Sequence, residues 1–223
     1  TYAGLISSHA LRAGATLAAF ERIGERYRAQ GVRRVLYKAV PHVFHAYPAE
    51  EDLYALHRLG AQLRRRELSS AIALREPFRF TPERKRSISR AGRSGIRLRR
   101  GGDIADFHAL LASVLQRHGA TPTHSLRELR LLQQRFPEGI VLHEALRGDE
   151  LLAGAIVYDF GRAVHTQYLA VSEEGRRLDA LSFLLAGLIV DVYAQRHYFS
   201  FGVSTEHDGQ GLNAGLVGQR DHL

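Results

Sequence analysis

The sequence predicts a mixed α/β fold, of the α+β kind, in which a mostly antiparallel sheet is flanked by helices. Three strand-like runs follow one another across short glycine-bearing turns, at residues 140–146, 151–160 and 163–171. Turns this short join antiparallel neighbours, so the three runs predict a meander. A helix that is apolar on every side then spans residues 178–195, and a strand at residues 198–203 follows it. This order indicates a helical crossover packed in the core.

The composition supports a hydrophobic core and excludes some classes of site. The chain has 223 residues, 45% of them hydrophobic, which is enough for one large domain or two small ones. It has no cysteine, which excludes disulfides and cysteine-bound zinc. We find no signal peptide and no apolar run long enough to span a bilayer, so we expect a cytoplasmic protein. The net charge of +8 predicts anionic partners.

The first third of the chain alternates helix and strand signals. Residues 10–29 carry apolar side chains at helical spacing, and Gly31 can cap that helix. The apolar run at residues 32–40 predicts a buried strand, and residues 63–74 predict another. Between them, Pro48 can open a short helix whose first turn holds three acidic residues, an arrangement that the helix dipole favours.

Two prolines, Pro77 and Pro82, mark a domain boundary. We therefore predict two domains, residues 1–76 and residues 77–223. Side chains that can cap a helix precede three helical stretches, at Thr81, at Asp103 and at the Ser125–Glu128 capping box. A short strand is expected at residues 96–100, between the first two of these helices.

The polar loop at residues 172–177 is the first candidate binding site, because it contains Gly175 and directly precedes the apolar helix. The N-terminus of a helix presents unpaired N–H groups and a partial positive charge, both of which attract phosphate. Arg176 and Arg177 add cationic donors there. The alternative is an ordinary strand–helix turn whose arginines are solvated.

Several motifs occur in a fixed order along nearly the whole chain. They are residues 1–6 (TYAGLI), 84–91 (RKRSISRA), 199–206 (FSFGVSTE) and 212–216 (LNAGL). Together they resemble the GNAT acyltransferase fold, and in detail its FemAB-like branch, in which two GNAT domains occupy one chain. Residues 37–42 (YKAVPH) and 48–54 (PAEEDLY) resemble an uncharacterised bacterial subgroup of that branch. The resemblance implies two tandem GNAT-like units, the first incomplete and the second without its last strands.

The resemblance also implies a function. A GNAT or FemAB-like N-acyltransferase would move an acetyl, other acyl or aminoacyl group onto an amine of a small molecule or of a sugar or peptide precursor of the cell envelope. The donor would be an acyl-CoA such as acetyl-CoA, or an aminoacyl-tRNA, and no metal is expected. Gly175, Arg176 and Arg177 would hold the donor's phosphates. Backbone N–H groups near Leu169 and Val171 would hold its carbonyl, between the strands 163–171 and 198–203.

Acyl transfer to an amine needs a polarised carbonyl, a deprotonated amine and a fixed attack geometry. Glu206 and Ser204 lie just beyond a strand end and could act as base or proton relay, although Glu206 could equally be a solvated acid. Tyr168 could be a general acid or a core residue, and alternation places it on the same face as Thr166. Asn213 could bind the donor or cap a helix.

An acceptor site is predicted in the first domain, at His42, Tyr47 and Glu50. The alternative is that the acids are first-turn helix charges and the histidines are loop residues. His42 and His45 lack the spacing of a helical zinc pair, so we do not expect a metal.

The densest positive charge lies in the basic helix and following strand, residues 82–100. Arg84, Lys85 and Arg90 could hold tRNA phosphates or a nucleotide-linked sugar, or could form a solvated face. They also support an alternative function, a non-catalytic tRNA-binding module that uses this helix.

Overall fold

The structure is a computed structural model that describes residues 4–7 and 11–214. Contacts divide the chain into two compact units, Thr1–Arg66 and Glu67–Leu223. The division falls before the predicted boundary at residue 76, because strand β1 (Ser69–Ala73) is paired within the sheet of the second unit.

The first unit contains two helices, α1 (Ala13–Ala29) and α2 (Glu51–Arg58), and a short 3-10 turn, η1 (His42–Phe44). Tyr37 connects its segments. Its ring packs on Phe20 with centroids 5.6 Å apart, and its hydroxyl donates to Asp52 Oδ2 at 2.6 Å and accepts from the Leu5 N–H at 2.8 Å. Burial is the largest cause that raises the pKa of Tyr37 to about 12.

The prediction of a buried strand at residues 32–40 is wrong. Only an isolated bridge at Lys38 occurs there. A strand needs a partner to satisfy its backbone groups, and the described part of the first unit contains no sheet for this apolar run to join. The strand predicted at residues 63–74 is shorter than expected and coincides with β1.

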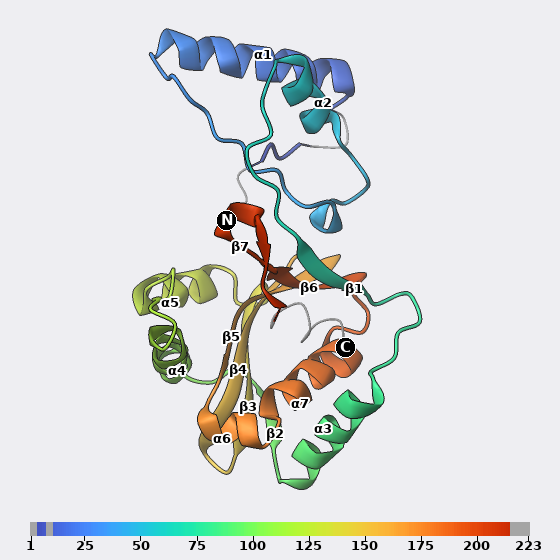
Figure 1. The fold of residues 1–223 in the computed structure, drawn as a ribbon, viewed down its shortest axis with the longest axis vertical. Coiled ribbons are helices and arrows are strands. Elements are labelled where there is room, and N and C mark those ends of the chain that lie inside the picture. Colours follow the sequence, from blue (N-terminus) through green and yellow to red (C-terminus); the bar gives the residue numbers. More distant parts are fainter. Residues whose placement is uncertain (1–3, 8–10, 215–223) are drawn as a thin grey trace. The chain divides into compact units, whose positions relative to one another are not determined.

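The second unit is built on a six-stranded sheet in the order β1-β6-β5-β4-β3-β2 (Figure 1). The remaining strands are β2 (Arg97–Arg100), β3 (Ile140–Arg147), β4 (Glu150–Asp159), β5 (Ala163–Val171) and β6 (Tyr198–Val203). Every neighbouring pair is antiparallel except β5 and β6, which are parallel. The predicted mixed, mostly antiparallel sheet with its meander is therefore confirmed. A separate hairpin pairs β7 (Thr205–Glu206) with β8 (Gly211–Leu212).

Helices cover both faces of this sheet (Figure 1). They are α3 (Pro82–Arg93), α4 (Ile104–Gln116), α5 (Leu126–Arg135), α6 (Glu173–Arg177) and α7 (Ala180–Gly187), which continues as a π-helical turn, η2 (Leu188–Val192). The predicted caps are confirmed: Thr81 and Asp103 accept backbone hydrogen bonds, and Ser125 with Glu128 forms a full capping box. The loop predicted at residues 172–177 is instead helix α6, and the apolar helix predicted to reach residue 195 gives way to η2.

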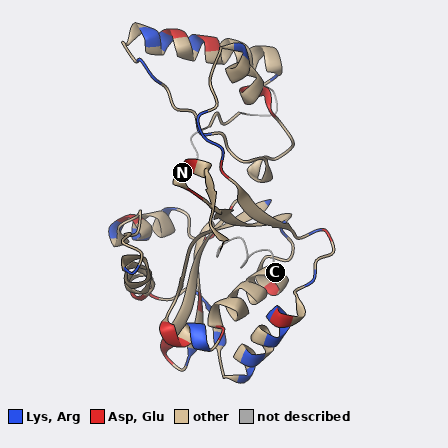
Figure 2. Cartoon of the chain, in the orientation of Figure 1, with Lys and Arg blue, Asp and Glu red and all other residues tan. Residues whose placement is uncertain are grey.

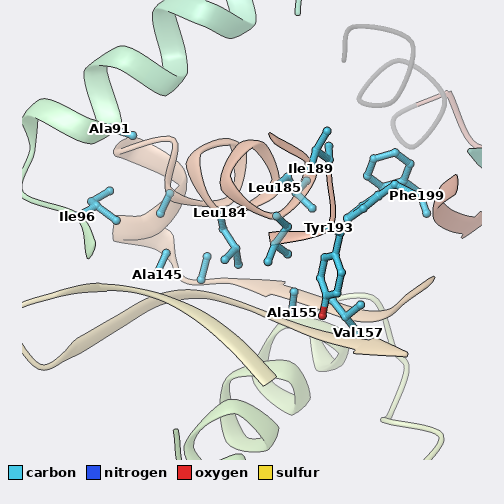
Figure 3. Close-up of a cluster of buried hydrophobic side chains, with 14 of the residues drawn as sticks. Ala91, Ile96, Ala145, Ala155, Val157, Leu184, Leu185, Ile189, Tyr193 and Phe199 are labelled. Atoms are coloured by element: carbon cyan, nitrogen blue, oxygen red, sulfur yellow. The ribbon is translucent and has the colours of Figure 1, made fainter. Parts of the chain in front are cut away.

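Two hydrophobic clusters fill the second unit. One lies under α3 and α7 and includes Leu184, Leu185 and Phe199 (Figure 3). The other lies under α4 and α5 on the opposite face and includes Phe107 and Leu142. Burial of this much apolar surface stabilises the sheet and fixes the positions of the strand ends that carry the candidate site.

Candidate active site

The central feature of the second unit is a fork between the parallel strands β5 and β6. Their ladder has three pairs, Ala163 with Tyr198, Val164 with Phe199 and His165 with Ser200. Beyond His165, β5 continues along β4 alone, while β6 continues along β1. In an antiparallel ladder every second residue directs its backbone N–H and C=O away from its partner. The far half of β5 therefore presents backbone groups on the side where pairing with β6 has stopped.

His165 lies at the point where the fork opens. It is half-buried, and its Nδ1 is 3.3 Å from the hydroxyl of Ser200, which is buried. The Gly202 N–H donates to the same hydroxyl at 3.3 Å. Gly202 has φ of +78°, and a Cβ at this position would lie 2.9 Å from Cε1 of His165. A glycine is therefore needed here both for the backbone conformation and for the space that the imidazole occupies.

A bulge in β5 decides where Tyr168 points. Tyr168 pairs with Ile156 and Thr166 pairs with Val157, so Gln167 is the extra residue. Directly paired residues share a face, so Tyr168 lies on the α4/α5 face and Thr166 on the opposite face. The prediction that Tyr168 and Thr166 share a face is wrong, because a bulge shifts the two-residue alternation of side chains by one position.

The hydroxyl of Tyr168 is held by His124, in the connection between α4 and α5. The His124 N–H donates to the Tyr168 oxygen at 3.2 Å, and the Nδ1 of His124 lies 2.7 Å from the same oxygen. Two contacts from one residue fix the phenol in a single orientation. The ring of Tyr168 therefore packs against the core, while His124 holds its hydroxyl oxygen in place at the surface of the sheet.

Tyr158, which no sequence pattern singled out, is paired directly with His165 across β4 and β5. Its hydroxyl is buried, and no described group accepts or donates a hydrogen bond to it. Burial, with a smaller contribution from Tyr168, raises the pKa of Tyr158. Buried polar groups in proteins almost always have partners, so an orphaned hydroxyl beside His165 is consistent with a place where water or ligand binds.

The three predicted catalytic residues have separate partners. Ser204 is buried, with its Oγ 3.3 Å from Ser70 Oγ and its N–H donating to a backbone carbonyl. Glu206 is exposed on the β7–β8 hairpin, where its Oε1 accepts a hydrogen bond from Asn213 Nδ2. Asn213 also donates its backbone N–H to the carbonyl of Ser204 at 2.9 Å. Asn213 thus connects Glu206 to the end of β6, whereas Tyr168 is held by His124 on the α4/α5 face.

The residues predicted to hold the donor are distributed as follows. Leu169 and Val171 lie on β5 beyond its last pair with β6, and they pair with Ala155 and Ala153 of β4. Gly175 is buried in α6, where a Cβ would lie 2.2 Å from the Leu152 carbonyl oxygen. Its N–H donates to Ser172 Oγ at 2.9 Å. The glycine therefore permits close packing of α6 on β4, and its N–H has an internal partner.

The charges on α6 do not suit a phosphate, which would need positive rather than negative side chains at the N-terminal turn of the helix. Glu173 and Glu174 occupy the first turn, while Arg176 and Arg177 are exposed in the last turn. Glu174 accepts from Arg147 at 3.1 Å and from Arg177 at 3.4 Å. Two carboxylates at the positive end of the helix satisfy the dipole and repel an anion. The first turn of α6 is thus a poor fit to a pyrophosphate.

Lys and Arg residues gather along the basic helix α3 (Figure 2), and two of its arginines contact the neighbouring helix. Arg84 donates to the hydroxyl of Ser182 at 2.6 Å, and Arg90 donates to the carboxylate of Asp179, so both connect α3 to α7. Lys85 is exposed and lines a shallow, mostly apolar groove of about 350 Å³ between these helices. Arginines of β2 are also engaged, in contacts to Gly148, Glu144 and Glu138.

The predicted acceptor residues lie on the surface of the first unit. His42 is exposed at the start of η1, Tyr47 is 37% exposed and Glu50 is the exposed residue before α2. Within residues 4–7 and 11–214, no cluster of three or more His, Asp or Glu side chains is suited to hold a metal ion. None of the helices described here is long and apolar enough to cross a bilayer.

Comparisons with known proteins agree with this geometry. A model of the acetyltransferase (GNAT) domain family matches residues 79–208, more than half of the chain. No curated protein sequence matches. Among solved structures, FemX is similar with a TM-score of 0.70 and 12% identity, over 94% of this chain and 73% of FemX.

Two further structures resemble the chain. The C-terminal domain of a putative lysylphosphatidylglycerol synthetase from Agrobacterium fabrum matches with a TM-score of 0.63 and 14% identity, over 84% of this chain and 60% of that one. The L-PGS of Bacillus licheniformis matches with a TM-score of 0.52 and 14% identity, over 69% of this chain and 50% of that one. At such identities these likenesses describe the fold alone, and the chain spans only part of each relative.

Proposed function

Because this chain belongs to the acetyltransferase (GNAT) domain family, we propose that it transfers an acyl or aminoacyl group to an amine at the β5/β6 fork. The acceptor would be the amine of a small molecule or of a cell-envelope precursor. The observation that carries this proposal is the three-pair ladder between β5 and β6. Where pairing stops, backbone N–H groups of β5 near Leu169 and Val171 can donate to the carbonyl oxygen of a donor and stabilise the negative charge that develops there.

We further propose an aminoacyl ester, such as an aminoacyl-tRNA, as the donor in preference to an acyl-CoA. The support is the first turn of α6, where Glu173 and Glu174 stand at the position in which coenzyme A would place its pyrophosphate. Gly175 cannot offer its N–H without losing its bond to Ser172. The name of the Agrobacterium relative, a putative lysylphosphatidylglycerol synthetase, also describes attachment of an aminoacyl group.

The proposed roles follow from the positions of the side chains. Glu206, exposed and oriented by Asn213, removes one proton from the acceptor ammonium before attack and releases it to solvent. Tyr168, fixed by His124, protonates the leaving oxygen, and its phenolate takes up the second proton that the amine nitrogen loses as the amide forms. Ser204, which is buried and bonded to Ser70, holds the end of β6 in place.

Binding roles are proposed for the remaining predicted residues. His42, Tyr47 and Glu50 would contact the acceptor, and we propose the first unit as part of an incomplete tandem GNAT-like domain. Lys85, with Arg84 and Arg90, would face the phosphates of the donor RNA, although the latter two also connect α3 to α7.

A transfer assay with two donors tests this function. Purified chain is incubated with labelled aminoacyl-tRNA or with acetyl-CoA, and with Nα-acetyl-lysine amide as a probe amine, and the amide product is measured. We expect product from the aminoacyl ester and little from acetyl-CoA. Thermal unfolding with free CoA provides a second measurement, because a ligand that binds only the folded state raises the melting temperature. A large CoA-dependent shift would contradict the donor proposal, and no product from either donor would contradict the transferase itself.

A further inference from the structure

The hydroxyl of Tyr168 forms its hydrogen bonds with a single residue, His124. The His124 backbone N–H lies 3.2 Å from the phenol oxygen, and His124 Nδ1 lies 2.7 Å from it. The two rings meet edge to face, with centroids 5.8 Å apart. Among the residues that the structure describes, this hydroxyl has no other hydrogen-bond partner. His124 therefore controls where the proton of Tyr168 can point.

The backbone of His124 is held from both neighbouring helices. Its carbonyl accepts a hydrogen bond from His108 Nε2 of α4 at 3.2 Å. It directly precedes Ser125, the N-cap of α5, whose capping box with Glu128 fixes the start of that helix. The ring of His124 is half-buried. Anchoring on both sides keeps this imidazole beside the phenol of Tyr168.

The charge of His124 decides the direction of the Tyr168 proton. A hydroxyl donates one proton and accepts with two lone pairs. The phenol oxygen already accepts the His124 backbone N–H, so with a neutral imidazole the phenol proton is donated to Nδ1, and the ring proton lies on Nε2. In a charged imidazole both ring nitrogens carry protons, so Nδ1–H donates to the phenol oxygen. His124 then fills both lone pairs of that oxygen, and the O–H points away from it.

We propose that His124 is the positioning residue for Tyr168, and that acyl transfer uses the form of the enzyme in which His124 is charged. The proposal rests on the transferase function proposed above. In the charged form the Tyr168 proton is directed to another group, the leaving oxygen of the ester. In the neutral form the same proton is bound to Nδ1 and is withheld from the substrate. Histidine suits this role because it is the side chain that changes charge near neutral pH.

Other ionisable side chains around this pair are Glu128, His108 and Tyr158. The pKa of Glu128 is lowered mainly by hydrogen bonds from the α5 cap and also by the charge of His124, so this carboxylate attracts a charged imidazole. His108 faces the His124 carbonyl through Nε2. Burial, with a contribution from Tyr168, raises the pKa of Tyr158, which keeps that phenol neutral. His124 is therefore the group of this cluster that changes charge beside Tyr168.

The protons of the reaction balance. Glu206 takes the first proton of the acceptor ammonium and releases it to solvent. The amine nitrogen attacks the ester carbonyl carbon and forms the C–N bond, and the C–O bond breaks as Tyr168 gives its proton to the leaving oxygen. The phenolate is held by the backbone N–H of His124 and by Nδ1–H, whose proton it shares until it takes the second proton of the amine nitrogen. Tyr168 is then neutral and His124 charged, as at the start, and the products are an amide and an alcohol.

The first test measures kcat between about pH 5 and 8, with labelled aminoacyl-tRNA and the probe amine. Wild-type kcat should fall on the alkaline side, where His124 loses its charge. His124→Asn keeps an N–H donor for the phenol oxygen at every pH, so it should stay active and lose this alkaline limb. His124→Leu should lower kcat at least about tenfold. His118→Asn, at an exposed position after α4, is the matched control and should give the wild-type profile.

Two further measurements separate positioning from folding. Because His124 acts through Tyr168, adding His124→Leu to Tyr168→Phe should lower kcat no further, whereas damage to the fold would add to the loss. In nuclear magnetic resonance spectra of the chain with ¹⁵N-labelled histidine, neutral His124 should carry its proton on Nε2, and Tyr168→Phe should shift its Nδ1 signal. His124→Asn identifies these signals by removing them.

The outcomes distinguish this inference from the proposed function. An alkaline limb that persists in His124→Asn, additive losses in the double variant, or a neutral His124 with its proton on Nδ1 would overturn the role of His124 alone. A wild-type chain that transfers no acyl group would overturn the proposed function, and this inference with it.

Discussion

Acidification should destabilise this protein through one buried histidine, His143 of β3. The ring is 3% exposed, and its Nε2 lies 2.8 Å from the hydroxyl of Tyr193 at the end of η2. Tyr193 extends from the helical layer to the sheet, as Figure 3 shows. Burial, together with the positive charge of Arg100, lowers the pKa of His143 from 6.5 to about 4. The folded chain therefore keeps this imidazole neutral at pH values where the unfolded chain protonates it.

The magnitude follows from the linkage between proton binding and folding. Above its unfolded-state pKa of 6.5, His143 is neutral in both states and contributes nothing to the pH dependence. As the pH falls, the unfolded state binds a proton that the folded state refuses, so stability is lost from about pH 6.5 down to about pH 4. One pKa unit corresponds to about 1.4 kcal/mol, which gives a loss of about 2 kcal/mol at pH 5 and about 3 kcal/mol near pH 4.

Urea unfolding followed by far-UV circular dichroism, at several pH values between about 4 and 7.5, measures this loss. In His143→Gln the side chain can still bond to Tyr193 but cannot titrate, so the difference from wild type isolates this one group. His118→Gln, at an exposed position, should follow the wild-type curve. If His143→Gln loses as much stability as wild type between pH 6.5 and 4, the buried neutral imidazole is not the cause and the reasoning fails.

Three further predictions concern packing, chemistry and charge. Gly175→Ala should lower the free energy of unfolding by about 2 kcal/mol or more, because the added Cβ would lie 2.2 Å from the Leu152 carbonyl oxygen. Urea unfolding measures this, with Gly14→Ala, whose Cβ meets nothing within 4 Å, as a control that should not destabilise. Glu206→Gln should lower kcat at least about tenfold with donor affinity unchanged, and an unaltered kcat would remove Glu206 from the mechanism. Arg90→Ala should lower the free energy of unfolding by no more than about 1 kcal/mol, because the arginine side chain is 61% exposed. A larger loss in urea unfolding would show that the ion pair with Asp179 is more than a surface contact.

Local signals allowed much of the fold to be predicted from sequence. The caps at Thr81, Asp103 and Ser125 depend on a few adjacent residues, and the structure reproduces them. The meander of β3, β4 and β5 was predicted for the same reason, because short turns leave little choice of partner. The prediction of a strand at residues 32–40 is wrong because strand formation depends on a partner strand distant in sequence, which no local pattern reveals.

The candidate site depended on information that is not local. His165 and Ser200 are brought together by a parallel register across the α7 crossover, and hydrophobic alternation does not specify such a register. The bulge at Gln167 moved Tyr168 to the face opposite Thr166, and no composition signal marks it. One signal was present but misread: acids followed by arginines at residues 173–177 suit the dipole of a short helix, which is what forms there.

Strand β1 has a consequence for how this protein can be divided. The family match begins at residue 79, yet β6 takes its outer backbone partners from Ser69–Ala73. A fragment cut at that match would lose β1, so the backbone groups of β6 that β1 satisfies would have no partner. Such a fragment should therefore unfold at a lower urea concentration than one that starts at Glu67.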